Sequence, residues 1–165
     1  MQLTIKGLQV IVDERQIERM VLDRFNEVDG EFASEIHEPP AIGEIWTGQG
    51  GIYGGVARGE NGAPDYYLIA GPEHDDDIAW QPAMDWARTV KVDGLADFTL
   101  PLPREQSILY GNLPELFKAR AYWSSKEYAS ASNGAWYQYF LNGGQGYYHK
   151  ASLIRARVLR RLPIH

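Results

Sequence analysis

The chain has 165 residues, of which 44% are hydrophobic, enough for the core of one domain and too many for a disordered segment. It contains no cysteine, which excludes disulfides, thiolate metal ligands and cysteine nucleophiles. A mean hydropathy of −0.38 and the lack of a long apolar run argue against membrane insertion. The first residues lack the apolar stretch and cleavage site of a secretory signal, so we expect a cytoplasmic location.

Charge is distributed unevenly along the chain. Residues 1–77 hold sixteen acidic and five basic residues, whereas residues 78–165 hold six acidic and eleven basic residues. This asymmetry has two interpretations: an acidic helix followed by loops, or two faces that meet different partners. The net charge of −6 disfavours nucleic acid as a partner, because duplex-binding surfaces are normally basic.

The first forty residues predict a strand, a helix and a linker. Alternating apolar residues predict a strand over 2–12. Apolar residues spaced i, i+3, i+4 and i+8 predict an amphipathic helix over 14–26, which covers the core or packs against a second copy as a homo-oligomer contact. Acidic residues, a glycine and two prolines mark 26–43 as a linker. We therefore expect an N-terminal extension over 1–40 and one domain over 41–165.

The remainder of the chain indicates an α+β domain. Glycine-rich segments and a turn signal predict a β-hairpin over about 50–70. Pro82 and Pro103 suit the first turns of two short helices, and Gly111 and Pro114 limit the second helix to about two turns. Three further strands are predicted over 121–125, 135–141 and 154–159.

An ordered set of motifs covers about three quarters of the chain. These are IGEIWTGQGGIYGG (42–55), the Trp80 to Ala87 helix, Gly94-Leu95-Ala96-Asp97-Phe98, Leu100-Pro101, Glu105, the segment from Tyr122 to Tyr128, Ala135-Trp136, Phe140, Gly143 and IRARVLR (154–160). In this order they resemble the domain family named after the C-terminal domain of the Legionella collagen-like adhesin, a family largely of unknown function.

The resemblance implies a C-type lectin-like fold, with two short helices and a twisted antiparallel sheet. Cysteine-free relatives look like phage and prophage proteins, which implies phage or prophage origin and adds association with the virion to the expected locations. Two departures stand out. Many members carry cysteines, whereas this chain has none, so the resemblance does not extend to an oxidised extracellular setting. Leu102 stands where members often have a Thr or Ser helix cap, which leucine cannot replace, although Pro103 presets the first turn.

Candidates for catalysis or metal binding are weak. Ser124-Ser125 lacks the Gly-x-Ser-x-Gly elbow of a serine hydrolase, and the resemblance makes these serines structural. The acidic run from Glu73 to Asp77 offers oxygen ligands that suit Ca²⁺, yet it lacks the spacing of a calcium loop and favours a solvated loop. Whether this run binds Ca²⁺ stays open. We expect no catalytic residues, no metal site and no cofactor.

The last part of the chain is basic. Its cations form a local positive patch or, as the pattern favours, solvated charges that deter pairing at a strand edge. They are Lys150, Arg155, Arg157, Arg160 and Arg161.

Six of the ten tyrosines fall between residues 121 and 150, interleaved with Ser, Asn and Gly. This composition is typical of recognition loops, where rigid rings give contact area at low entropic cost. Strand alternation places Trp136, Gln138 and Phe140 on a core face and Tyr137 and Tyr139 on the other, with Tyr147 and Tyr148 in a loop. The predicted ligand-binding residues are Tyr128, Asn133, Tyr137, Tyr139, Asn142, Tyr147 and Tyr148. Core packing of the tyrosines is the alternative.

These observations predict a non-enzymatic binding module of phage or prophage origin that recognises a host protein or glycan through this Tyr/Gly/Asn/Ser-rich surface. The alternative is an intracellular counter-defence inhibitor that docks on a basic host protein through its acidic N-terminal half.

Overall fold

The computed structural model describes the backbone of residues 2–5 and 8–11 and all of residues 38–165. The chain divides into two compact units, unit 1 (Met1–Pro39) and unit 2 (Pro40–His165). In unit 1, β1 (Gln2–Ile5) and β2 (Leu8–Ile11) pair antiparallel. The prediction of one strand over 2–12 is therefore wrong, because alternation is the same in one strand as in two that turn back on each other. The predicted helix over 14–26 lies outside the described residues.

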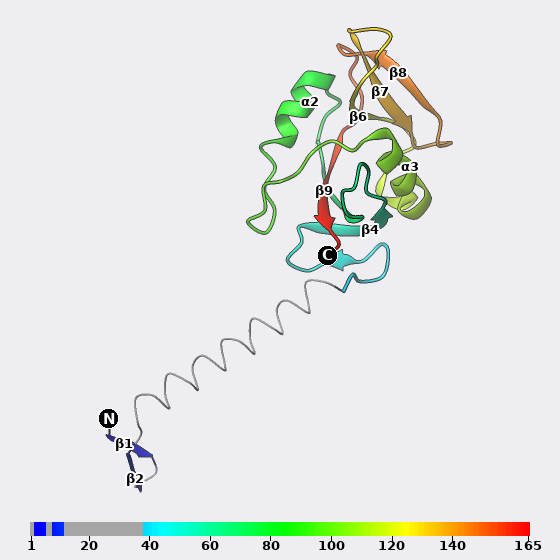
Figure 1. Cartoon of the computed structure of the whole chain (residues 1–165). Coiled ribbons are helices and arrows are strands. Elements are labelled where there is room, and N and C mark those ends of the chain that lie inside the picture. The colour runs from blue at the N-terminus through cyan, green and yellow to red at the C-terminus, as the bar shows by residue number, and fades with distance from the viewer. Residues whose placement is uncertain (1, 6–7, 12–37) are drawn as a thin grey trace. The chain divides into compact units, whose positions relative to one another are not determined.

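Unit 2 is α+β, with two α-helices and two antiparallel sheets among its residues (Figure 1). The larger sheet has the order β3-β4-β5-β9, formed by β3 (Ile45–Trp46), β4 (Gly51–Ala57), β5 (Tyr66–Glu73) and β9 (Arg157–Pro163). The smaller sheet has the order β6-β7-β8, formed by β6 (Ala121–Glu127), β7 (Gly134–Tyr139) and β8 (Gln145–His149). The predicted hairpin over 50–70 is confirmed as β4 and β5.

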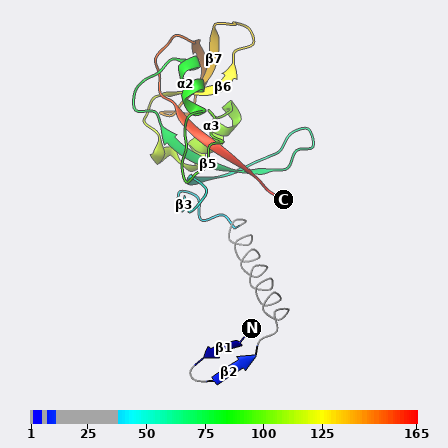
Figure 2. The same ribbon diagram turned by 90° about the vertical axis from the view of Figure 1, so that its left-hand side faces the viewer.

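The end of the chain returns to the start of unit 2. Strand β9 runs beside β5, where Tyr66 pairs with Pro163 and Ala70 pairs with Leu159 (Figure 2). It begins at Arg157 rather than at Ile154 as predicted, because Ile154 forms an isolated bridge to Ile78 instead. This long-range pairing fixes the C-terminal segment against β5 at the edge of the larger sheet.

Two helices connect the sheets, α2 (Trp80–Ala87) and α3 (Pro103–Asn112), and a short 3₁₀ turn, η1 (Pro114–Leu116), follows α3. Helix α3 is longer than the predicted two turns, because Gly111 lies inside it. Its start is stabilised by Glu105 Oε2, which accepts the Leu102 N–H at 2.7 Å, although Leu102 itself provides no side-chain cap for the first turn. No helix in residues 38–165 is long and apolar enough to cross a bilayer.

Three apolar clusters lie among residues 38–165, and two of them pack the helices against the sheets. The first packs α2 against β6 and β9 and includes Trp80, Ala83, Phe98, Leu100, Trp123, Ala135, Ala156 and Val158. The second lies under α3 and includes Leu68, Ala70, Leu109, Leu113 and Leu159. Helix α3 approaches β4 closely because Gly54 has no side chain; a Cβ there would lie 2.7 Å from Leu109 Cδ2. The predicted burial of Gln138 and Phe140 is confirmed, whereas Trp136 is only half-buried.

The closing arginines form ion pairs and hydrogen bonds inside unit 2. Arg155 is 4% exposed and its Nη2 lies 3.3 Å from Glu73 Oε2. Arg160 Nε donates to Asp97 and Arg161 Nε donates to Glu105, both at 2.6 Å. The further partners of these arginines are Asp77 for Arg155, the carbonyl oxygens of Gly71 and Leu116 for Arg157, and Gln49 for Arg160. Both interpretations of these four arginines, as a basic patch and as solvated edge charges, are therefore wrong.

The acidic run from Glu73 to Asp77 supplies several of the partners of these arginines. Glu73 accepts hydrogen bonds from Tyr122 and its carboxylate faces Arg155, while Asp77 pairs with Arg120 and Arg155. The two ends of the run are thus tied to the sheets rather than solvated as a loop. No group of three His, Asp or Glu side chains in residues 38–165 is arranged to hold a metal ion.

Candidate functional site

The tyrosines of the smaller sheet gather around the β7–β8 hairpin, on two faces. In an antiparallel pair, residues directly opposite each other share a face. Trp136 lies opposite Tyr147, and Ala135 lies opposite Tyr148. Trp136 and Tyr147 therefore point to one side of the sheet, and Tyr148 points to the other.

The first face carries the outer stack, formed by Tyr128, Trp136 and Tyr147. The rings of Tyr128 and Tyr147 are parallel, with centroids 3.9 Å apart, and Trp136 meets Tyr128 edge-on at 5.3 Å. Tyr147 is nevertheless 51% exposed. A ring that is held by a stack and still reaches solvent has little rotational freedom to lose when it contacts a ligand.

The second face carries the inner stack, formed by Tyr137 and Tyr148, whose ring centroids are 4.2 Å apart. Tyr148 is 41% exposed, but Tyr137 packs against the first apolar cluster. The expectation that Tyr137 faces away from the core is wrong, because its neighbour Ala135 on the same face is fully buried. Burial and the neighbouring Tyr148 raise the pKa of Tyr137.

The other predicted site residues lie at the ends of the hairpin. Tyr139 is half-buried at the end of β7, and Asn142 stabilises the following turn by accepting the Gly144 N–H at 3.0 Å. Asn133 is exposed at the opposite end. The structure therefore brings Tyr128 together with Tyr147, and Tyr137 together with Tyr148, but it does not unite all seven predicted residues on one surface. Tyr147 and Tyr148 lie in strand β8 rather than in a loop as predicted.

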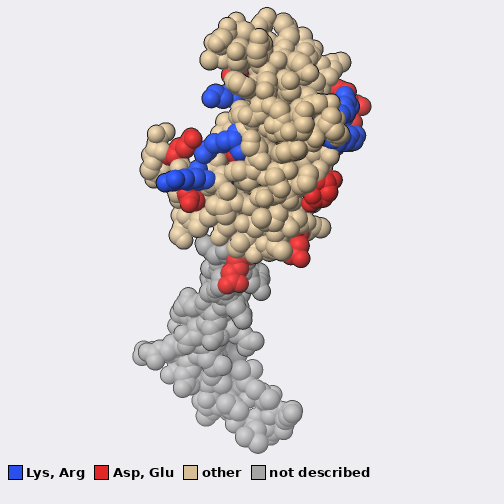
Figure 3. Space-filling view, turned by 90° about the vertical axis from the view of Figure 1, so that its right-hand side faces the viewer, with Lys and Arg blue, Asp and Glu red and all other residues tan. Residues whose placement is uncertain are grey.

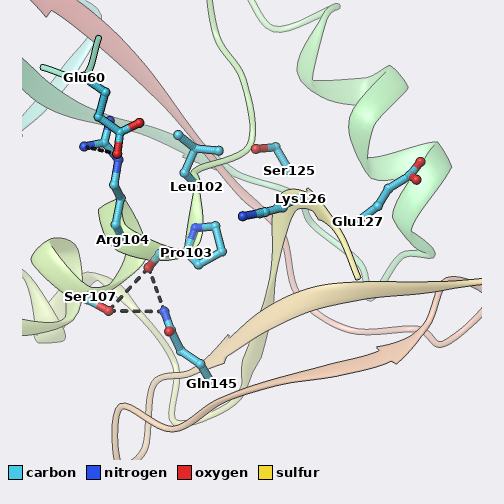
Figure 4. A pocket seen from close by; sticks show the side chains of 9 residues that line it. All are labelled: Glu60, Leu102, Pro103, Arg104, Ser107, Ser125, Lys126, Glu127 and Gln145. Carbon is cyan, nitrogen blue, oxygen red and sulfur yellow. Dashed lines mark hydrogen bonds and ion pairs between the residues drawn. The ribbon is translucent and has the colours of Figure 1, made fainter. Parts of the chain in front are cut away.

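A cavity of about 840 Å³ lies between the start of α3 and strands β6 and β8 (Figure 4). Its walls come from the start of α3, the end of β6, the start of β8 and the β4–β5 loop. The lining residues are Glu60, Leu102, Pro103, Arg104, Ser107, Ser125, Lys126, Glu127 and Gln145. The volume is within the range of sites that bind small molecules.

Gln145 links this cavity to the outer stack. It lies opposite Gln138 and two residues before Tyr147, so it points to the same face of the sheet as the outer stack. Its Nε2 donates to Pro103 O at 2.7 Å and to Ser107 Oγ at 3.2 Å (Figure 4). The cavity and the outer stack thus share one face of the sheet, and we call them together the β8 surface.

The β8 surface is poor in charge outside the cavity. Figure 3 shows few charged side chains over the upper end of unit 2, where Figure 1 places β6, β7 and β8. Exposed aromatic rings with little neighbouring charge are typical of the centre of a binding interface.

The sequence analysis missed the residues that line the cavity. Arg104, Lys126 and Gln145 belong to three segments that only the tertiary fold brings together. The one local signal was Asn142-Gly143-Gly144, which marks a turn and allows the following residues to pair back onto β7 as β8. No family model matches this sequence, and no curated protein is significantly similar to it.

Proposed function

We propose that unit 2 has a C-type lectin-like fold and acts as a non-enzymatic binding module of phage or prophage origin, which recognises a host protein or glycan through the β8 surface. The fold assignment rests on the ordered motifs of residues 41–162, together with the observed pair of helices and pair of antiparallel sheets. The function rests on one observation, the half-exposed ring of Tyr147 held in a parallel stack on Tyr128.

This arrangement favours binding for a physical reason. Aromatic anchors at interfaces contribute most when they are rigid before the partner arrives, because less conformational entropy is lost on association. Tyr147 is fixed by its stack and by the pairing of β8 with β7, and Tyr148 is fixed in the same way on the opposite face. Each hydroxyl group also supplies a hydrogen-bonding tip, so protein and glycan ligands both fit the chemistry.

Substitution of single rings tests the proposal. The full chain is used to capture ligands from a host lysate and from a panel of host surface glycans, and the captured ligand is then titrated against variants. Tyr147→Ala is expected to weaken binding about 5- to 30-fold, the loss typical of an interface anchor. Ile45→Ala is the control, since Ile45 is 74% exposed on β3, in the other sheet. Unchanged affinity of Tyr147→Ala and Tyr148→Ala would refute the proposal.

Ionic strength separates this function from docking through the acidic N-terminal half. Binding by exposed rings changes little with salt, whereas binding by many surface carboxylates weakens steeply. In the described part of that half, Glu73 and Asp77 are already paired with arginines. A steep loss of affinity between low and high salt, with no effect of Tyr147→Ala, would favour the inhibitor instead.

A further inference from the structure

The cavity of the β8 surface contains a cation that has no partner among the described residues. Lys126 lies near the end of β6, and its side chain points toward Pro103, into the space between α3 and the sheet (Figure 4). No ion pair or hydrogen bond engages its Nζ within residues 38–165, although the chain pairs most of its closing cations internally. An ammonium group beside a cavity attracts an anionic group of a ligand.

The other charges of the cavity are already engaged. Arg104 Nη1 donates to Arg58 O at 2.8 Å and lies 3.3 Å from Glu60, while its Nη2 donates to the Tyr66 hydroxyl at 3.0 Å. Glu127 lies 3.2 Å from Lys150 and points away from the cavity in Figure 4. Because Arg104 and Glu60 pair with each other and Glu127 pairs with Lys150, the ammonium group of Lys126 is the unpaired charge among the residues that line the cavity.

Neutral polar groups surround this charge. Ser107 and Ser125 carry hydroxyl groups, and Gln145 uses its Nε2 on α3, which leaves its carbonyl oxygen as an acceptor for a ligand hydroxyl. Leu102 and Pro103 add an apolar part to the wall. A carboxylate together with several hydroxyl groups is the chemistry that complements this lining.

The outer stack favours a saccharide as the carrier of that carboxylate. Trp136 and Tyr147 lie on the face that Gln145 shares, and a pyranose ring presents C–H groups that pack on the electron-rich face of an aromatic ring. We infer that the β8 surface binds an acidic saccharide, with the carboxylate of a uronic or sialic type of residue at Lys126 Nζ and a neighbouring sugar ring against the outer stack. This inference rests on the proposed binding function and specifies its ligand.

A matched pair of ligands tests it. The probes are an oligosaccharide that contains uronic acid and the same oligosaccharide with its carboxyl groups reduced to alcohols, each titrated calorimetrically against the full chain. The acidic form is expected to bind about tenfold more tightly, the usual effect of a charge-assisted hydrogen bond. Lys126→Gln should abolish this difference. Lys91→Gln, which removes an exposed lysine outside the cavity, should preserve it.

The outcomes distinguish this inference from the function on which it rests. Equal binding of the two oligosaccharides, or a preference that survives Lys126→Gln, overturns the role of Lys126. If neither oligosaccharide binds and a captured host ligand still depends on Tyr147, the acidic saccharide is wrong and the binding function stands. A polyglutamate peptide that binds in their place through Lys126 would assign the carboxylate to a protein instead. Binding of the acidic oligosaccharide that depends on Lys126 but not on Tyr147 supports the cavity and contradicts the outer stack.

Discussion

The carboxylate of Glu105 is the most heavily used polar group under α3, and its replacement by glutamine gives a direct test of the packing. Glu105 is 0% exposed. Its Oε1 accepts hydrogen bonds from the Tyr66 hydroxyl and from Arg161 Nε, both at 2.6 Å. Its Oε2 accepts from Leu102 N at 2.7 Å and from Arg161 Nη2 at 2.8 Å. Four donors from three parts of the chain therefore converge on one side chain.

Glu105→Gln keeps the shape and removes one acceptor. The amide oxygen can still accept two of these hydrogen bonds, but the new NH₂ group faces the remaining two donors. Each buried donor left without an acceptor costs about 1–3 kcal/mol. The Arg161 side chain is 32% exposed, so water recovers part of its loss. Since the broken contact is also a buried ion pair, we expect a loss of about 3 kcal/mol in the free energy of unfolding.

Denaturant titration of the full chain, followed by fluorescence, measures this difference. A loss of about 3 kcal/mol lowers the melting temperature by roughly 10 °C in a unit of this size. Glu115→Gln is the matched control, because Glu115 is an exposed carboxylate on η1 and should change stability by less than about 0.5 kcal/mol. If Glu105→Gln is as stable as this control, the carboxylate does not hold α3 and the network described here is wrong.

Three further predictions concern acid pH, alkaline pH and close packing. Burial raises the pKa of Glu73, but hydrogen bonds from Tyr122 and Arg155 outweigh it and lower this pKa below its ordinary value of 4.5. The free energy of unfolding should therefore fall as pH drops below about 4.5. Glu73→Gln should weaken this pH dependence, as measured by denaturation midpoints in acid. Burial, followed by the hydrogen bond to Glu73, raises the pKa of Tyr122 to about 12, so stability should also fall as pH rises above 10. Gly51→Ala should lower the free energy of unfolding by about 2–3 kcal/mol, because the new Cβ would lie 2.2 Å from Ala70 O. Gly111→Ala is the control, since its Cβ meets no atom and alanine favours the helix, so it should stabilise α3. Equal denaturation midpoints for the two variants would contradict the close spacing of β4 and β5.

Local patterns were sufficient for the elements whose signals lie within a few residues. The hairpin of β4 and β5 follows from glycine-rich segments and a turn signal, and Pro82 and Pro103 mark helices α2 and α3 near their observed starts. The same reasoning failed for β8. Its sequence, Gln-Gly-Tyr-Tyr-His, has no apolar alternation, since it is an exposed edge strand that forms because a tight turn pairs it with β7.

The arginines show what local patterns cannot provide. Arg155 and Arg157 alternate with apolar residues like charges on a solvated edge, and Arg160 and Arg161 follow them; nothing nearby in sequence contradicts that interpretation. The carboxylates that pair with Arg160 and Arg161 lie 63 and 56 positions away in the sequence, and Arg155 pairs with Glu73 in the larger sheet. Burial of such charges is tolerated only where the fold brings an opposite charge into contact, so the prediction requires the topology first.

This internal pairing also shapes the proposed function. The closing arginines and the carboxylates of Glu73, Asp97 and Glu105 neutralise one another within unit 2, so the proposed ligand contacts of the β8 surface are mainly rings and neutral polar groups. Lys126 is then a single positive charge in a nearly neutral surface, and its field is not cancelled by a neighbouring carboxylate. One such charge selects an acidic ligand over its neutral analogue without making affinity depend steeply on salt, since screening acts on one contact while the rings provide the remainder. The larger sheet thus carries most of the arginines and carboxylates that stabilise unit 2, whereas the smaller sheet carries the exposed lysine and the aromatic stack of the proposed binding site.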